Sequence, residues 1–283
     1  MHRIIIHSRY AIYITAAFFS ILISLWVNSA ASLLNPDAIC YLQSAETMHQ
    51  GLHTAMTLCD QSQWPLYPLL IAGLAELTKL SYEHAAFIWN GLFSLLSVLV
   101  FVRIAQSLTD KKSVHWLAAF VILLPHEFNS LRQDIIRDHG FWCFYLLSIY
   151  FLIRYFQQKN TVSALGWGCS MLIATLFRLE GAIFLLCVPF LVWFETEQRF
   201  VERFKAFLRL NMPILFGSAC IFVMLFLHPD MFLGRINDLI HNLQPSHFYS
   251  SVIQQYILFA DALGQLVLGR SYHDRYIIYF GTF

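Results

Sequence analysis

Long apolar runs separated by short polar stretches form the dominant pattern along the chain. Seven runs lie at residues 10–30, 84–104, 113–125, 141–156, 161–177, 182–194 and 207–227. A membrane-spanning helix needs about 20 mostly apolar residues, and most of these runs approach or reach that length. Those at 113–125 and 182–194 are short for a span. The pattern predicts an all-α membrane helix bundle with about seven spans.

A further apolar stretch, residues 66–80, is shorter and contains Glu76 and Lys79. Lys and Arg concentrate in the cytoplasmic loops of membrane proteins, so their distribution indicates whether this stretch crosses. If it does not cross, the inner loops hold most of the basic residues and the connection 31–65 holds none. If it crosses, the basic cluster at 103–112 moves outside. We therefore expect an interfacial helix at 66–80 on the outer face, and a cytoplasmic N-terminus.

The first run follows the basic start MHRIIIHSR. A cleaved signal peptide is the competing interpretation, because VNSAAS resembles a small-residue cleavage site. Signal peptides carry an apolar region of about 7–15 residues, and the region here is longer. The length favours a retained membrane anchor.

Composition agrees with a membrane protein. Of the 283 residues, 58% are hydrophobic and only 12% are charged, and the mean hydropathy is +0.58. A soluble domain carries about a quarter charged residues, so this chain has too few to cover a surface that faces water. The 26 Phe and 13 Tyr suit lipid-facing helices with aromatic belts. A net charge of +1 without a basic run among aromatics gives no sign of nucleic-acid binding.

Four segments share the predicted outer face. They are residues 31–65, 125–140, 177–181 and the tail from 228 onward. The first segment carries Asp37, close to the end of the first span. One interpretation is a first-turn aspartate that the helix dipole favours. The other is a general base, because a carboxylate at the membrane boundary can accept a proton from a bound hydroxyl.

The stretch LRQDIIRDHGF carries two acids, Asp134 and Asp138, with Arg132 and Arg137 beside them. The acids are four residues apart and share one face if the stretch is helical. A solvated cap with local ion pairs is one interpretation. The other is a pocket in which Asp138 orients a polar substrate and Arg137 binds an anion. The planar guanidinium suits phosphate because it can bind two oxygens at once.

Two shorter motifs lie on the same face. FRLEG places Arg178 and Glu180 in a tight turn, where they neutralise each other or where Arg178 faces a lipid phosphate. WPLYPLL brings Trp64 and Tyr67 to the interface, where prolines and aromatics commonly fix the start of a helix.

The six cysteines fall into two groups. Cys143, Cys169, Cys187 and Cys220 lie in apolar runs and are typical of small buried hydrophobes. Cys40 and Cys59 are the two cysteines of the outer loop, and the periplasm is oxidising, so we expect a disulfide between them. No Cys/His spacing matches a zinc site. No cofactor is indicated, and a requirement for a divalent metal is left open.

Taken together, these stretches resemble the superfamily of integral-membrane glycosyltransferases with the GT-C fold. The similarity is greatest to the bacterial branch related to protein mannosyltransferases and lipopolysaccharide-modifying sugar transferases. It rests on PDAICYLQSAETMHQG after the first span, then WPLYPLLIAGL, RDHGF at the head of a later span, and TLFRLEG. It covers roughly residues 11–194. The order of these motifs and their predicted side of the membrane are more specific to the superfamily than the individual residues are.

The resemblance implies transfer of a sugar, hexosyl or pentosyl, from a polyprenyl-phosphate donor to a lipid or glycan acceptor on the outer membrane face. Asp37 would be the base, and Asp138, directly before a span, would support it. Arg137 and Arg178 would bind the donor phosphate. The supporting residues would be Asp134, Glu180, Tyr41, Trp64 and Tyr67. The expected location is the bacterial inner membrane, in contact with membrane lipids, with the active face in the periplasm.

The domain organisation follows from the same pattern. We expect a seven-span module at residues 1–227 and an outer-face tail at 228–283, in which 252–269 forms an interfacial helix or an eighth span. Members of the superfamily usually continue with more spans, whereas this chain stops within YIIYFGTF. A truncated non-catalytic scaffold therefore remains an alternative. A lipid or polyisoprenoid transporter is a second, but its polar residues are expected at the midplane, and here the acids cluster at one face.

Overall fold

The computed structural model describes residues 2–30, 34–195, 199–227, 253 and 256–257. The chain divides into two compact units, Met1–Ala219 and Cys220–Phe283. The first unit contains all the predicted site residues, and the fold is described for this unit. The predicted tail helix at 252–269 lies outside the described residues, apart from positions 253, 256 and 257.

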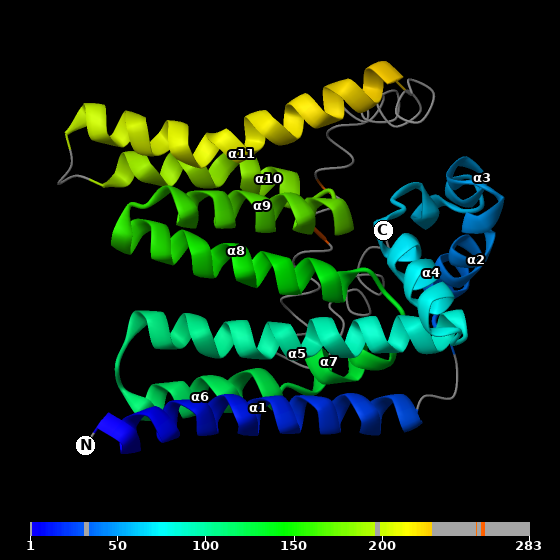
Figure 1. Cartoon of the computed structure of the whole chain (residues 1–283), viewed down its shortest axis with the longest axis horizontal. Helices are drawn as coiled ribbons and strands as arrows, with labels where there is room; N and C mark the ends of the chain where they lie inside the picture. Colours follow the sequence, from blue (N-terminus) through cyan, green and yellow to red (C-terminus); the bar gives the residue numbers. More distant parts are fainter. Residues whose placement is uncertain (1, 31–33, 196–198, 228–252, 254–255, 258–283) are drawn as a thin grey trace, which may run out of the picture. The chain divides into compact units, whose positions relative to one another are not determined.

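Seven long helical segments lie side by side (Figure 1). They are α1 (His2–Ala30), α5 (Tyr82–Leu108), α6 (Lys112–Leu123), α8 (Asp138–Gln158), α9 (Thr161–Phe177), α10 (Gly181–Cys187) continued by η4 (Val188–Phe194), and α11 (Phe200–Leu227). Helix α1 contacts α5 and α6, α5 contacts α8, and α9 packs between α8 and α10. Each apolar run of the sequence coincides with one of these segments. No strand occurs among the described residues, so the all-α prediction is confirmed.

Two of these helices are long and apolar enough to cross a membrane. They are α5 and the segment Tyr10–Ser29 of α1. The apolar helices α6, α9 and α10–η4 are shorter, in line with the short runs of the sequence. The count of seven spans therefore stays a prediction.

Large apolar side chains project from the outer surfaces of these helices. Trp26, Leu117, Phe190 and Phe216 are each more than half exposed. Water-soluble monomers rarely present large apolar patches, whereas lipid tails solvate such side chains. This exposure agrees with an integral membrane protein.

A group of short helices lies at one end of the long ones (Figure 1). It consists of α2 (Pro36–Thr47), η1 (Met48–Gln50), α3 (Leu52–Met56), η2 (Asp60–Gln63) and α4 (Leu66–Thr78). Helix α2 packs on α3, η2 and α4, and α4 packs on α5 and α9. With 13 residues, α4 measures about 20 Å at a rise of 1.5 Å per residue, less than the ~30 Å of a bilayer core. Its length suits the predicted interfacial helix.

The connection between α6 and α8 differs from the simplest expectation. It contains α7 (His126–Ser130) and η3 (Leu131–Gln133), and the backbone then leaves helical geometry at Asp134 until α8 begins at Asp138. Because the helix is interrupted, the spacing of four residues does not place Asp134 and Asp138 on one helical face. Arg132 does not pair with these acids either. Its Nη1 donates to Ser20 O and Oγ and to Ser24 Oγ of α1, at 2.8–3.0 Å.

Close helix contacts hold the bundle together. Gly140 of α8 lies against the ring of Phe177, and Gly168 of α9 lies against Pro213 of α11. A Cβ atom at Gly140 would approach the Phe177 ring to 2.3 Å, so α8 and the end of α9 meet at a position that only glycine allows. This contact brings the start of α8 next to the turn that follows α9.

Candidate active site

Three chain segments that carry predicted site residues meet at the same end of the bundle. They are the start of α2, the start of α8, and the turn between α9 and α10. Asn35 joins the first two, because its Oδ1 accepts a hydrogen bond of 3.0 Å from Ile135 N. Trp64 joins the short helices to α9, since its Nε1 donates to Thr175 O at 3.0 Å. These tertiary contacts place the predicted charged residues beside one another.

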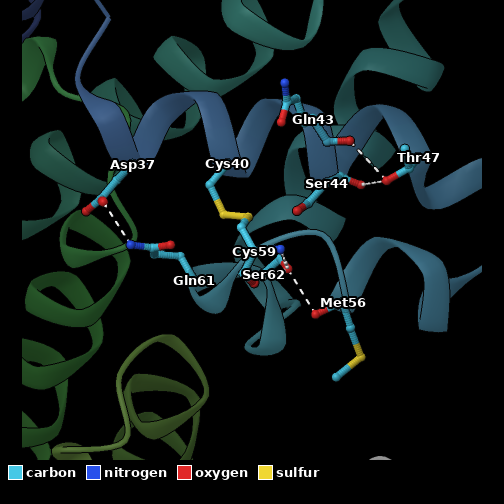
Figure 2. Close-up of a disulfide and its surroundings, with 9 residues drawn as sticks. All are labelled: Asp37, Cys40, Gln43, Ser44, Thr47, Met56, Cys59, Gln61 and Ser62. Carbon is cyan, nitrogen blue, oxygen red and sulfur yellow. Dashed lines mark hydrogen bonds between the residues drawn. A yellow bond between two sulfur atoms is a disulfide. The ribbon is translucent and has the colours of Figure 1, made fainter.

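Asp37 occupies the first turn of α2. Pro36 takes the first helical position and Asn35 is the N-cap, although the Asn35 side chain does not cap the helix. The Asp37 carboxylate is half-buried, and its Oδ1 accepts a hydrogen bond of 3.1 Å from Gln61 Nε2 (Figure 2). The position of Asp37 therefore suits both interpretations: the helix dipole favours a carboxylate in this first turn, and the carboxylate is partly exposed and could accept a proton.

The disulfide between Cys40 and Cys59 lies next to this carboxylate (Figure 2). The two Cα atoms are 6.2 Å apart, inside the usual range for such a bond. The predicted pairing of the two cysteines in the loop 31–65 is confirmed.

Asp138 and Arg178 form an ion pair between the start of α8 and the turn after α9. Arg178 also pairs with Glu180, with 2.6 Å between Nη2 and Oε1. The bond to Glu180 and the charges of both carboxylates raise the pKa of Arg178 above its ordinary value, against an opposing effect of burial. The same contact with Arg178 lowers the pKa of Glu180. One arginine therefore pairs with two carboxylates.

The phenol of Tyr41, on α2, is influenced by four charged side chains of the candidate site. Burial raises the pKa of its phenol to about 12, and four charges act on it besides. Arg137 and Arg178 lower the pKa, whereas Asp37 and Asp138 raise it. The charges of all four groups therefore act on this hydroxyl. The tyrosine ring itself is buried and packs edge-on against Tyr67, 5.2 Å between centroids.

Arg137 differs from Arg178 in its surroundings. It is the N-cap residue of α8 and is only partly buried. Within the described part of the chain, no hydrogen bond or ion pair involves its guanidinium group, although its charge also lowers the pKa of Glu180. Its donors are therefore available to an anion.

The remaining predicted residues support this arrangement through the backbone. Tyr67 of α4 donates its hydroxyl proton to Asn90 Oδ1 at 2.6 Å, and Asn90 Nδ2 donates to Asp134 O at 2.8 Å. Asp134 is thus held by its carbonyl, while its side chain is half-buried and burial raises the pKa of its carboxyl group. This chain of contacts fixes the connection just before α8.

Two contributors were not identified from the sequence. Gln61 stands in a polar loop and carries no pattern that predicts a contact with Asp37. The sequence shows the charge of Arg132, but its burial against α1 depends on a partner more than 100 positions away. The one sequence signal for this partner is the spacing of Ser20 and Ser24, which lie four residues apart and so share a face of the N-terminal helix.

Two other features of the described region lie apart from the charge cluster. An open groove of about 620 Å³ runs between α1 and α5, and none of the predicted site residues lines it. Over the described ranges, no group of three His, Cys, Asp or Glu side chains could hold a metal ion.

Comparisons with known proteins give one match. Residues 60–224 match the family model described as dolichyl-phosphate-mannose-protein mannosyltransferase. This segment contains Asp138, Arg137, Arg178, Glu180 and Gln61, and Asp37 precedes it. No curated protein and no solved structure matches the chain.

Proposed function

Because the chain belongs to the dolichyl-phosphate-mannose-protein mannosyltransferase family, we propose that its outer charge cluster transfers a sugar to an acceptor hydroxyl, with Asp37 as the base. The family match covers more than half of the chain and confirms the resemblance to GT-C glycosyltransferases. The protein is a membrane glycosyltransferase of the mannosyltransferase type that uses a polyprenyl-phosphate-linked sugar. The residue roles, the outer-face location and the acceptor are the proposal.

The reaction is a single displacement at the anomeric carbon. Asp37 takes the proton of an acceptor hydroxyl, and the resulting oxygen nucleophile forms a bond to the anomeric carbon. The bond from that carbon to the phosphate oxygen breaks, and polyprenyl phosphate leaves. One displacement inverts the configuration at the anomeric carbon.

The arginines differ in their roles. Arg137 binds the leaving phosphate, because its guanidinium group is available and positive charge there stabilises the charge that develops on the leaving group. Arg178 is tied to Asp138 and Glu180, and its main role is to fix Asp138. Asp138 then orients the acceptor.

The observation that carries this proposal is that the starts of α2 and α8 and the turn after α9 meet through the Asn35–Ile135 hydrogen bond and the Asp138–Arg178 ion pair. Two carboxylates and two guanidinium groups are thereby gathered at one end of the bundle, and all four act on Tyr41. A base for the acceptor and a cation for the leaving phosphate are the two groups that this displacement needs. The cluster also lies at the end of the bundle where the connection 31–65 lacks Lys and Arg, which supports an outer-face site. The acceptor hydroxyl belongs to a glycan, a lipid or a protein.

The test is the variant Asp37→Asn, which keeps the size of the side chain and removes the base. Transfer from polyprenyl-phosphate mannose should fall by about 10²–10⁴-fold, the usual contribution of acid–base catalysis, while binding of the donor lipid persists. Glu46→Gln is the matched control, because Glu46 is an exposed carboxylate on the same helix. Near-normal turnover by Asp37→Asn would contradict the mechanism. Donor binding by the wild type without any transfer would favour the non-catalytic scaffold.

A further inference from the structure

The disulfide joins the helix that carries Asp37 to the segment that carries Gln61. Cys40 lies one turn after Asp37 on α2, so the two side chains share a face of the helix. Cys59 is the N-cap residue of η2 and precedes Gln61 by two positions. One covalent bond therefore keeps the two segments at a fixed spacing (Figure 2).

Internal hydrogen bonds make η2 a stiff turn. The backbone N–H of Cys59 donates to Ser62 Oγ at 3.2 Å, and the backbone N–H of Ser62 donates to Cys59 O at 3.1 Å. Ser62 is buried, and its hydroxyl lies 3.0 Å from Met56 O. The turn thus follows the position of Cys59, which the disulfide sets.

Gln61 reaches from this turn to the carboxylate of Asp37 (Figure 2). Its Nε2 donates to Oδ1 at 3.1 Å, across 24 positions of sequence. The amide is neutral, so it orients the carboxylate without cancelling its negative charge. A donor on Oδ1 also leaves Oδ2 to receive the proton of an acceptor.

We propose that Gln61 is a positioning residue for the base, held on Asp37 by the Cys40–Cys59 disulfide. The inference rests on the proposed function of Asp37. It adds a condition to that function: full turnover needs the disulfide as well as the carboxylate. A base must be oriented toward its proton within hydrogen-bond distance, and a displacement of about 1 Å can lower a rate about a hundredfold.

The experiment measures transfer of mannose from polyprenyl-phosphate mannose to acceptors in a membrane extract, with the purified full chain. Gln61→Ala should lower kcat by about tenfold to a hundredfold and leave the KM for the donor lipid unchanged. Gln43→Ala is the matched control, because Gln43 lies on α2, is exposed and points away from η2 (Figure 2). Its kcat should equal that of the wild type.

Reduction of the disulfide with tris(2-carboxyethyl)phosphine tests the coupling. Reduction should lower the kcat of the wild type by the same factor as the Gln61→Ala substitution does. The double variant Cys40→Ser/Cys59→Ser should have the same kcat as the reduced wild type. Reduction should cause no further loss in Gln61→Ala. A second, equal loss in Gln61→Ala would show that the disulfide acts independently of Gln61 and would overturn the proposal.

Thermal unfolding of each variant separates positioning from folding. If reduction lowers Tm below the assay temperature, the kcat of Gln61→Ala alone tests the positioning role, because this variant keeps the disulfide intact. An unchanged kcat in Gln61→Ala, with Asp37→Asn inactive, overturns this inference and leaves the proposed function standing. Normal turnover by Asp37→Asn overturns the proposed function itself.

Discussion

The two arginines of the site illustrate how neighbours decide what a charged residue can do. Arg178 pairs with two carboxylates, whereas the Arg137 guanidinium makes no such contact within the described residues. An anion gains more from a cation whose charge is not already offset. The partners of a basic residue are therefore more informative about its role than its position on the predicted outer face.

From this difference we expect Arg137→Ala to weaken binding of polyprenyl phosphate by about tenfold or more, since hydrogen bonds to charged groups are the strong ones. Arg178→Ala should weaken it less and should lower Tm, because Asp138 and Glu180 lose their shared partner. Arg137→Ala should affect the donor lipid more than the acceptor, as measured by separate binding titrations. Arg137→Lys is the charge-conserving control. Equal losses for donor and acceptor would argue against a phosphate site.

Tyr41 gives a prediction for the dependence of stability on pH. Burial raises the pKa of its phenol from the ordinary value of about 10 to about 12. The folded state therefore holds this proton more tightly than the unfolded state. The associated stability is complete below about pH 10 and is lost as the pH rises through about 12.

Comparison with Tyr41→Phe isolates this effect, since the other tyrosines titrate in both proteins. Between about pH 10 and pH 12 the Tm of the wild type should fall relative to that of Tyr41→Phe. Circular dichroism melts over this range supply the measurement. A constant difference in Tm would mean that the phenol titrates alike in the folded and unfolded states.

At the scale of helices, replacement of two helical glycines by alanine should change the free energy of unfolding in opposite directions. A Cβ at Gly168 of α9 would lie 2.1 Å from Pro213 Cγ, and the proline ring cannot move aside. Overpacking of this kind costs about 1–3 kcal/mol. At Gly73 of α4, nothing lies within 4 Å of the added atom, and alanine in a helix interior gains about 0.5–1 kcal/mol over glycine.

We therefore expect Gly168→Ala to lower the free energy of unfolding and Gly73→Ala to raise it slightly, as measured by denaturant titration in detergent. The pair controls for helix propensity, because both changes are glycine to alanine. Stabilisation by Gly168→Ala would mean that α9 and α11 pack less closely than the structure indicates.

At the scale of the whole molecule, the membrane topology joins the charge pattern to the location of the site. A cytoplasmic N-terminus places α2 to α4 and the charge cluster on one side, and the α5–α6 turn on the other. In a background without Cys143, Cys169, Cys187 and Cys220, Gln50→Cys and Lys112→Cys report on the two sides; both positions are exposed.

A membrane-impermeant maleimide should label Gln50→Cys in intact cells and Lys112→Cys only after the membrane is permeabilised. The expectation follows from the concentration of Lys and Arg in the inner loops. Labelling of Lys112→Cys in intact cells would place the α5–α6 turn outside and would mean that α4 crosses the membrane.

The sequence by itself determined the helices, the membrane class and the family resemblance, because these depend on local composition. The apolar runs at 84–104 and 161–177 form α5 and α9, and they can do so whether lipid or a neighbouring helix covers their surface. The Cys40–Cys59 pairing could also be predicted, since the loop 31–65 contains only these two cysteines. The residues of the charge cluster could be picked out because acids and arginines are rare in this chain.

Only the tertiary structure decided how those residues are paired. Gln61 meets Asp37, Arg132 is buried against Ser20 and Ser24, and Arg178 rather than Arg137 binds Asp138. Each of these contacts joins positions 24 or more apart in the chain. A hydrogen bond between distant positions depends on where the packed helices place both groups, and local sequence patterns do not contain that information.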